Sequence, residues 1–498
     1  MASEEIVKRL TEADRLVTAD AARLIGTLED PGYVAEQILL EKTAPIVTVE
    51  LVQEIVRKRE EKKIPLPVEV VRSSGFAPAA KELEPDLRFL PDKEVTGKSR
   101  CTGSLDDFVL YFRDRHKRLE SVLLGHHSNL ATVPISSLRK SARGSEVRVI
   151  GLVADKRVTK NGHILLELES EDDTAKVLAL KSEKSGDVFS AASSVLLDDV
   201  IAVEGRLSEA FLIASQITWP DVPPREARRA EREVCAAFVS DTHVGSRNFL
   251  EGPFKRMLSW LNGNCPPGER ELAGKVKYLF VAGDAVDGVG VYPGQENELA
   301  ILDIHDQYKA FCELLAQVPN YIEVIVIPGN HDAVRRAEPQ PAIGAELVKD
   351  HAPPNAHFLG NPSQLEVEGL RALLYHGTSL DSIIAAIPNS SYERPEKAMA
   401  ELLKRRNLSP IYGENPIIPE HRDYMLIDEA PDLIHMGHLH KNGADRYKGT
   451  FLLNAGTWQA RTSFQIRLGH VPTPCFLPVY NLRSLKLDVI NFGEAQHG

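Results

Sequence analysis

The chain has 498 residues, a formal net charge of −12 and a hydrophobic content of 43%. This length favours more than one domain, and the hydrophobic content suffices for sizeable cores. The five cysteines are scattered and include no Cys-x-x-Cys pair, which argues against a zinc ribbon and a disulfide framework. The acidic balance argues against a protein that grips nucleic acid unaided, because such proteins usually present a basic stripe.

The start of the sequence is acidic, whereas a secretory signal peptide is basic and then apolar. No apolar stretch is long enough to span a bilayer. With scattered cysteines that fit a reducing compartment, we expect a cytoplasmic protein without a membrane partner.

Residues 1–75 are predicted to form a small helical module. Apolar residues recur at helical spacing between positions 51 and 56, after Thr48, and residues 57–63 supply a charged end. Such a unit is either an interaction module or a plain bundle. Residues 76–103 lack periodicity and contain several prolines, so we expect a linker there.

Residues 104–220 are predicted to hold a capping helix and a β-barrel. Ser104 and Asp107 have the spacing of a capping box, which indicates a helix start. The apolar stripe that follows is expected to pack on the barrel, and its residues are Phe108, Phe112, Leu119 and Leu123.

Five short strands with glycine-punctuated turns fit an OB-type barrel. They are expected at residues 147–153, 164–168, 175–180, 200–205 and 210–217. Such barrels often bind single strands through aromatic residues. This barrel has few aromatics, which favours docking on a protein over binding of nucleic acid.

Residues 220–233 are predicted to be a solvated linker that leads to the last domain, residues 234–498. There, short β-branched runs alternate with helical patterns at residues 254–261 and 299–318, which predicts a layered α/β domain. Its strands are expected at residues 234–239, 278–282, 321–327, 372–375 and 433–436.

A polar cluster follows each of these five runs, at residues 240–243, 283–288, 329–332, 376–377 and 437–440. Each cluster alone could be a turn. Because ligands bind at the carboxyl ends of strands in open α/β sheets, we expect the clusters to converge at one edge. Together they supply Asp, Asn and His, a set suited to borderline divalent ions rather than to calcium. Two such ions about 3.5–4 Å apart would suit phosphodiester hydrolysis.

The five clusters resemble those of the calcineurin-like metallophosphoesterase superfamily, over roughly residues 234–480. The resemblance implies an α+β multidomain protein whose last domain has four layers, α/β/β/α. It implies that the first metal is held by Asp241, His243 and His440, and the second by Asn330, His376 and His438. Asp284 would bridge both, since a bridging ligand must be an anion with two oxygens.

The same resemblance implies a catalytic role for His331, which would assist at the phosphate and leaving oxygen without binding a metal. Asp332 would orient it. The metals are expected to be two manganese ions, with iron or zinc as alternatives. His305 and His435 stay unassigned. The remaining histidines are interpreted as ordinary core or surface residues, among them His116, His126, His127, His351, His357, His421 and His470.

Residues 283–295, together with the order of helical head, barrel and phosphoesterase, resemble the small-subunit family of the archaeal family D DNA polymerases. This resemblance covers essentially the whole chain. It implies a 3′→5′ proofreading exonuclease that acts on DNA 3′ ends within a heteromeric replicative polymerase. The polymerase active site would lie on a large catalytic subunit.

Two other functions stay open: a stand-alone metallophosphatase, and a structural accessory subunit with a vestigial metal site. The barrel argues against the first, because a simple phosphatase has no need of it. The complete set of implied ligands argues against the second.

Overall fold

The computed structural model describes residues 3–13, 15–28, 31–40, 46–53, 55–56, 75–171, 173–182, 186–467 and 469–493. The chain forms two compact units, Met1–Glu69 and Val70–Gly498. It is a mixed α+β multidomain protein with a closed barrel and several sheets, as predicted. Within the described part, no helix is both long enough and apolar enough to cross a membrane.

The first unit is a small helical module. Its elements are α1 (Ser3–Glu12), β1 (Leu16–Val17), α2 (Ala19–Thr27), α3 (Pro31–Leu40) and β2 (Ile46–Val47). Ile6, Ile25 and Ile38 meet in its core. The helix predicted after Thr48 is present at residues 49–53 and 55–56. The charged end predicted for residues 57–63 lies outside the described residues.

The second unit contains a closed barrel. Its strands are β4 (Glu146–Val158), β5 (Ile164–Glu169), β6 (Thr174–Ala179), β7 (Val200–Leu207) and β8 (Leu212–Thr218). They close in the order β4-β5-β6-β8-β7. Alternate residues such as Leu166 and Leu168 point into the barrel core, as the period of a strand requires. The five predicted strands are therefore present, and α6 (Gly186–Ser194) packs against them.

Helix α5 (Leu105–Leu124) begins at the predicted capping box. The Ser104 hydroxyl accepts from the Asp107 amide, and the Asp107 carboxylate accepts from the Ser104 amide. The predicted stripe is only partly right, because Phe108 and Phe112 contact the ring of Tyr412 rather than the barrel.

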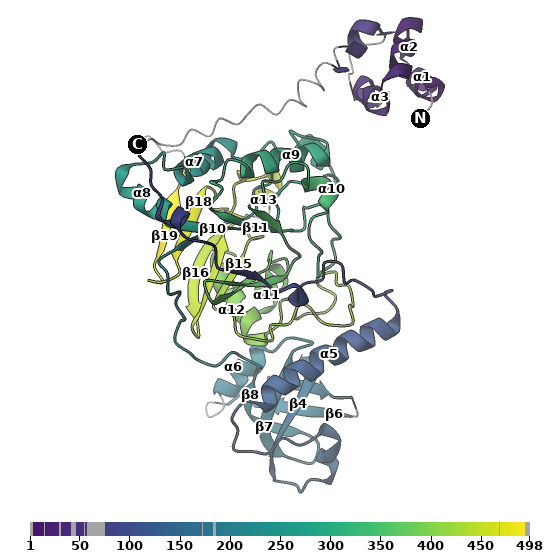
Figure 1. The fold of residues 1–498 in the computed structure, drawn as a ribbon. Helices are drawn as coiled ribbons and strands as arrows, with labels where there is room; N and C mark the ends of the chain where they lie inside the picture. Colours follow the sequence, from purple (N-terminus) through teal and green to yellow (C-terminus); the bar gives the residue numbers. More distant parts are fainter. Residues whose placement is uncertain are drawn as a thin grey trace. The chain divides into compact units, whose positions relative to one another are not determined.

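The second half of α5 packs on the barrel through Leu119 and Leu123, as predicted. The middle of the helix instead buries Arg115, whose Nε donates to the Asp423 carboxylate at 2.8 Å. Asp423 belongs to the region beyond residue 234, so α5 contacts both the barrel and the following domain (Figure 1). Pairing with a carboxylate is what makes the burial of this guanidinium tolerable.

The described part of the last domain is built around two six-stranded sheets. The first contains β9 (Cys235–Val239), β10 (Val276–Ala282), β11 (Glu323–Ile327), β12 (Ala356–Phe358), β18 (Phe476–Asn481) and β19 (Leu487–Asn491). The second contains β3 (Leu87–Phe89), β13 (Ser363–Val367), β14 (Leu370–Leu374), β15 (Leu433–Met436), β16 (Asn442–Tyr447) and β17 (Thr450–Ala455). The runs β12-β11-β10-β9 and β14-β15-β17 are parallel, so their carboxyl ends share an edge in each sheet.

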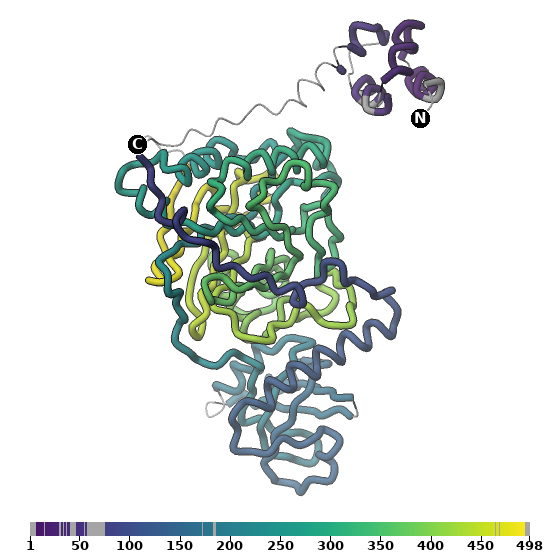
Figure 2. The backbone as a smooth tube through the Cα atoms, viewed as in Figure 1, coloured from purple at the N-terminus to yellow at the C-terminus, as the bar shows by residue number. Residues whose placement is uncertain are grey.

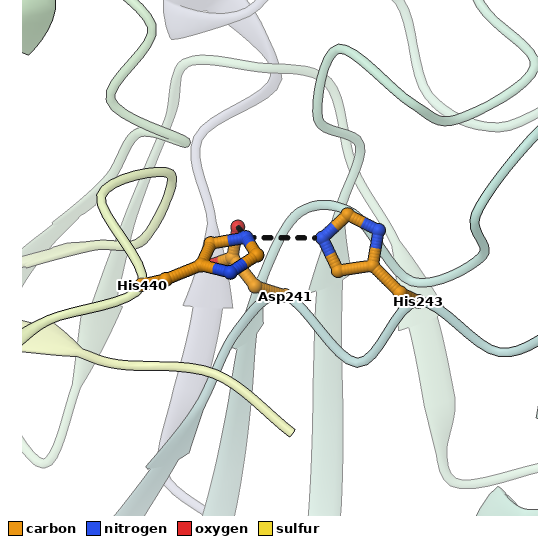
Figure 3. A group of neighbouring side chains, drawn as sticks. All are labelled: Asp241, His243 and His440. Carbon is orange, nitrogen blue, oxygen red and sulfur yellow. Dashed lines mark hydrogen bonds and ion pairs between the residues drawn. The ribbon is translucent and has the colours of Figure 1, made fainter. Parts of the chain in front are cut away.

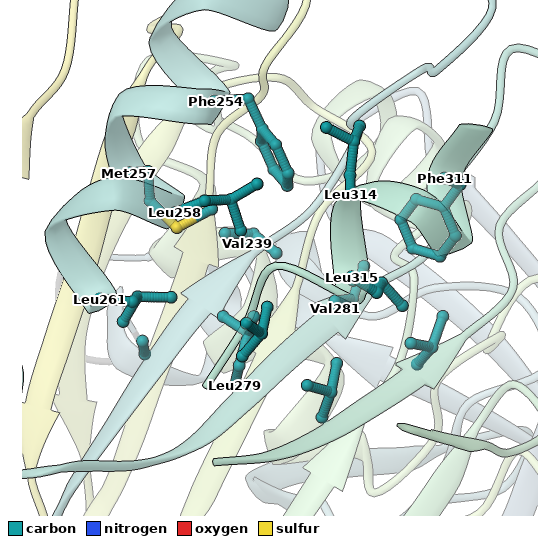
Figure 4. Packing of buried hydrophobic residues seen from close by; sticks show 14 of the residues in the cluster. Val239, Phe254, Met257, Leu258, Leu261, Leu279, Val281, Phe311, Leu314 and Leu315 are labelled. Carbon is teal, nitrogen blue, oxygen red and sulfur yellow. The ribbon is translucent and has the colours of Figure 1, made fainter. Parts of the chain in front are cut away.

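Each face of the first sheet is buried. One face packs against α7 (Glu251–Leu261) and α9 (Ile304–Leu315), where Phe254 and Phe311 meet Leu279 and Val281 of β10 (Figure 4). The other face meets the second sheet. Burial on both faces explains why β10 is apolar without a break from Tyr278 to Ala282 rather than alternating.

The second sheet is buried in the same way. Between the two sheets, the rings of Phe238 and Phe280 stack at 5.4 Å beside Leu374. Beyond the second sheet, Ile434 of β15 packs with α11 (Leu380–Ala386) and α12 (Pro395–Arg405). Short helices α8 (Pro267–Gly274), α10 (Ala345–Val348) and α13 (Ser463–Arg467) complete this domain in the described residues.

The segment predicted as a linker, residues 76–103, belongs instead to the last domain. Figure 2 shows it, in dark blue, running along that domain towards α5. Its strand β3 pairs antiparallel with β13, and its two short 3₁₀ helices are η1 (Ala79–Glu82) and η2 (Pro91–Lys93). Three residues of strand are too short to give a periodic pattern, which explains why the sequence reads as a linker.

The prediction of a solvated linker at residues 220–233 is also wrong, because arginines tie this segment to the last domain. Arg225 and Arg228 both contact the buried carboxylate of Asp432. Arg232 contacts the buried Glu368. These ion pairs hold the strand-to-strand connection against the second sheet.

Candidate metal centre

The five polar clusters lie where the parallel strands end. Asp241 follows β9, Asp284 follows β10 and Asn330 follows β11, while His376 follows β14 and His438 follows β15. The two sheets thus present their carboxyl edges to one another, and the structure brings the predicted ligands together there.

The backbone at this edge is strained. Five of the predicted ligands have a positive φ: Asp241 (51°), His243 (50°), Asp284 (50°), His438 (69°) and His440 (54°). A left-handed conformation in a residue other than glycine costs on the order of 1–3 kcal/mol and is concentrated at functional sites. The surrounding fold therefore forces these side chains inward.

Two glycines make room for the predicted ligands. A Cβ on Gly329 would lie 2.2 Å from Oδ1 of Asp284, and one on Gly437 would lie 2.3 Å from Oδ2 of Asp241. Neither carboxylate could keep its position beside a larger residue. The glycines of the clusters are thus required by the close approach of backbone and carboxylate.

Asp241, His243 and His440 form the first group of potential ligands (Figure 3). Nε2 of His243 and Nε2 of His440 face each other at 3.1 Å, and Nε2 of His440 lies 3.3 Å from Oδ1 of Asp241. Burial alone would raise the pKa of Asp241, but the adjacent His440 lowers it.

Asn330, His376 and His438 form a second group. Oδ1 of Asn330 lies 2.9 Å from Nε2 of His376 and 3.1 Å from Nδ1 of His438. One amide oxygen therefore sits between two imidazoles. This is the set that the sequence assigns to the second metal.

Asp284 lies between the two groups. Its Oδ2 is 3.7 Å from Nε2 of His243 and 3.4 Å from Nε2 of His376. Burial alone would raise the pKa of this carboxyl, but His376 and His331 hold it well below its usual range. The position matches that expected of a bridging carboxylate.

The arrangement fits divalent metal ions. Atoms within 4.8 Å of one another make three possible ligand groups, which overlap at Asp241, His243 and Asp284. One of these groups includes His331, which the resemblance does not count as a ligand. Two buried carboxylates need compensating positive charge. Borderline divalent ions accept this mixture of carboxylate and imidazole.

In three of the histidines, the ring nitrogen that points away from the centre also supports the binding of metal ions. Each lies 2.9 Å from an oxygen acceptor, which leaves the inner nitrogen to face the centre. The pairs are His243 with Asp287, His376 with the carbonyl of Ala282, and His438 with Asp381. Histidines that bind metals in proteins are held in this way by a second partner.

His331 lies beside these groups, as predicted, but its partner differs from the predicted one. Nδ1 of His331 donates to the carbonyl of Asp287 at 2.8 Å. The Asp332 carboxylate instead accepts from the Gly329 amide and the Tyr308 hydroxyl. The prediction that Asp332 orients His331 is therefore wrong. Asp332 organises the loop that carries His331, because adjacent side chains of an extended loop point in different directions.

A cavity of about 500 Å³ opens over the centre. His243, Asp284 and His331 line its floor, and Tyr292, Tyr392 and His470 contribute to its walls. His470, interpreted from the sequence as an ordinary histidine, also borders this cavity. His470 and Asp381 follow no strand and belong to no cluster, so only the folded chain brings them to the site.

Comparison with known proteins places the chain in a class. The family model for the B subunits of DNA polymerases alpha and epsilon matches residues 236–443. The DNA polymerase II small subunit of Methanocaldococcus jannaschii is 40% identical over 408 residues, which cover 81% of this chain and 68% of that protein. The small subunit of Archaeoglobus fulgidus is 42% identical, with 81% and 80% covered. That of Methanothermobacter thermautotrophicus is 37% identical, with 97% and 99% covered.

The relatives thus first define the class, which is the small subunits of DNA polymerases. More particularly, the chain belongs to the family of DNA polymerase II small subunits. This agrees with the resemblance expected from the clusters and the domain order.

Proposed function

We propose that this chain is the 3′→5′ proofreading exonuclease subunit of a heteromeric replicative DNA polymerase. The observation that carries the proposal is the convergence of two buried carboxylates and several imidazoles beside one cavity, which His243, Asp284 and His440 line. A vestigial site would have no reason to keep buried carboxylates and strained backbone that cost stability.

The proposal includes the domain arrangement. In the described residues, the first unit would be the helical module, and residues 104–220 would be the capping helix and an OB-type barrel. The region from residue 234 on, joined by residues 76–103, would be a four-layer α/β/β/α phosphoesterase domain. The hydrophobic clusters on both sides of each sheet support these layers.

Two divalent ions, which we propose to be Mn²⁺ with iron or zinc as alternatives, would activate water and neutralise charge at phosphorus. Asp241, His243 and His440 would hold one ion. Asn330, His376 and His438 would hold the other, and Asp284 would touch both.

His331 is proposed to act on the substrate directly. Because its Nδ1 donates to a carbonyl, the proton on that nitrogen is fixed and Nε2 is the atom left to exchange a proton. Burial lowers the pKa of His331, which keeps Nε2 unprotonated near neutral pH. The ring therefore can take up a proton at the reacting phosphate and return it to the leaving oxygen.

The partner is proposed to be a large catalytic subunit that carries the polymerase site and delivers the DNA. The net charge of −12 favours such delivery, because the chain has no excess of cations for gripping DNA. A frayed or mismatched 3′ end would then reach the cavity as a single strand.

A trimming assay tests this proposal. A primer labelled at its 5′ end is incubated with Mn²⁺ and the full chain, with and without the large subunit, and the products are separated on a gel. We expect a descending ladder from the 3′ end, with the large subunit raising the rate more on mismatched than on matched primers. Rapid hydrolysis of small phosphomonoesters without any action on DNA would instead favour the phosphatase.

A further inference from the structure

Two aromatic side chains form a wall at the mouth of the cavity. The rings of Tyr392 and His470 meet edge to face, with centroids 4.2 Å apart and planes at 72°. Both residues line the cavity over the metal centre and also a second hollow of about 230 Å³. The wall thus separates two adjoining spaces.

Each residue of the wall is linked to a predicted metal ligand through one neighbouring residue. Tyr392 lies close enough to the Asp381 carboxylate for the two groups to shift each other's pKa, and Oδ2 of Asp381 lies 2.9 Å from Nε2 of His438. On the other side, the His470 amide donates to the carbonyl of Gln465, whose Nε2 lies 2.8 Å from Nδ1 of His440. These links fix the positions of Tyr392 and His470 relative to the predicted metal ligands.

The second hollow has the charge and the exposure that a nucleotide needs. Lys441 lines it and donates to the carbonyl of Val471 at 3.1 Å, which places an ammonium beside the wall. The same ammonium lies 2.5 Å from the Glu393 carboxylate, which is 64% exposed whereas the Lys441 side chain is 15% exposed, so a phosphate reaches this ammonium by displacing the Glu393 carboxylate. Val471 is 53% exposed and extends the apolar surface outward. An aromatic face next to a cation is the usual composition of a surface that binds single-stranded DNA.

We infer that Tyr392 and His470 bind the penultimate base of a single-stranded DNA 3′ end, while the terminal nucleotide occupies the cavity over the metal centre. The inference rests on the proposed function and names the substrate subsite that it needs. Because cleavage takes place at the metal centre, the cavity beside it receives the last nucleotide, and the second hollow receives the one before it.

This placement gives a physical reason why the proposed exonuclease should prefer unpaired 3′ ends. A base that stacks on the wall has left its own helix, because a paired base is covered by its neighbours. A matched 3′ end must therefore open by two nucleotides before cleavage, whereas a mismatched end is already partly open. Stacking on an aromatic side chain contributes about 1–3 kcal/mol per base, whatever the base.

The test pairs a change in the protein with a change in the DNA. The full chain and its variants Tyr392→Ala and His470→Ala are given a single strand whose penultimate nucleotide is either normal or abasic. Removal of one nucleotide is measured as kcat/KM in Mn²⁺, and binding of the same strands is measured by anisotropy in EDTA. Tyr392→Phe keeps the ring and loses the hydroxyl, and Tyr412→Ala removes a half-exposed tyrosine remote from the cavity.

The wild-type chain should bind and cleave the abasic strand about tenfold less well than the normal strand. Each alanine variant should lose about tenfold on the normal strand and nothing further on the abasic strand, because the two changes remove the same contact. Tyr392→Phe and Tyr412→Ala should keep the wild-type preference. Hydrolysis of bis(p-nitrophenyl) phosphate, which has no base to stack, should fall less in the alanine variants than removal of the normal nucleotide does.

Two results would overturn the inference: an abasic penalty that persists unchanged in both alanine variants, or an equal loss on DNA and on the small diester. The second would mean that the wall acts only by supporting the ligands. If the wild-type chain cleaves no DNA at all, the proposed function fails instead, and the binding measurements in EDTA still decide whether the wall contacts the base.

Discussion

Oδ2 of Asp381 lies 2.9 Å from Nε2 of His438, a histidine whose other ring nitrogen faces Asn330 at 3.1 Å. Burial alone would raise the pKa of Asp381, but the neighbouring His438 lowers it, so the carboxylate stays charged. The contact fixes which nitrogen of His438 bears a proton and turns the other toward the centre.

Removing this carboxylate should weaken metal binding. We expect Asp381→Ala to lower the affinity for Mn²⁺ by about 10- to 100-fold, as is usual when the partner of a metal-binding histidine is lost. Competition with a chelator measures the affinity. Asp350→Ala, at an exposed position, is the matched control and should bind as the wild type does. Unchanged affinity in Asp381→Ala would show that His438 needs no such support.

His331→Ala should separate binding from chemistry. Because no metal is assigned to His331, the variant should retain two metal equivalents while its cleavage rate falls by about 10²–10⁴-fold, the usual effect of losing a general acid or base. Metal content is measured by mass spectrometry alongside the rate. Loss of one equivalent would make His331 a ligand and refute its catalytic role.

The buried pair that joins α5 to the last domain should matter for stability. Arg115 and Asp423 are 1% and 0% exposed, and Arg115→Ala would leave the carboxylate buried without its partner. We expect a loss of about 3–5 kcal/mol in the free energy of unfolding, measured by urea denaturation. Arg113→Ala breaks the exposed pair with Glu171 and should cost at most about 1 kcal/mol. Equal effects of the two variants would contradict the role given to the buried pair.

Metal binding should depend on pH. Burial disfavours a charged ring, but the surrounding carboxylates raise the pKa of His243 to about 9 and that of His376 to about 10 from the usual 6.5. Without metal, both rings hold a proton at neutral pH, and each must lose it to bind. Affinity for Mn²⁺ should therefore increase from pH 6 to about 9 with proton release, detected by calorimetry in buffers of different ionisation enthalpy.

The raised pKa values of His243 and His376 make the metal-free fold less stable at high pH, where metal binding is strongest. Because the pKa values of His243 and His376 are raised in the fold, their protonated rings stabilise the metal-free protein. This stabilisation is complete below about pH 6.5 and is lost as the pH rises through about 9–10. The rise in Tm on adding Mn²⁺ should therefore be larger at pH 9 than at pH 6. Binding without proton release, or a rise in Tm that is the same at both values, would contradict the protonation of these rings.

The convergence of the clusters could be predicted because it follows from local patterns. Apolar runs such as residues 433–436 end where polar residues begin, and parallel strands bring such ends to one edge. The barrel strands and the start of α5 at Ser104 were predictable for similar reasons. The metals assigned to these residues stay a prediction.

Features that depend on distant segments were not predictable. Leu87–Phe89 becomes a strand only because β13, far along the chain, offers an open edge. Arg115 looks like a break in an apolar stripe until Asp423 is seen opposite it. His470 and Asp381 likewise gain a role only from neighbours that the fold supplies.

Metal content and DNA cleavage, measured together in wild type and in Asp284→Ala, test the central claim most directly. Asp284→Ala should keep its fold by circular dichroism but lose bound metal and nuclease activity, because two cations that lack the anion between them repel each other. Asp306→Ala, an exposed carboxylate on α9, should behave as the wild type. The account predicts two metal equivalents and 3′→5′ trimming in the wild type and neither in Asp284→Ala. Normal metal content with normal trimming in Asp284→Ala would contradict it.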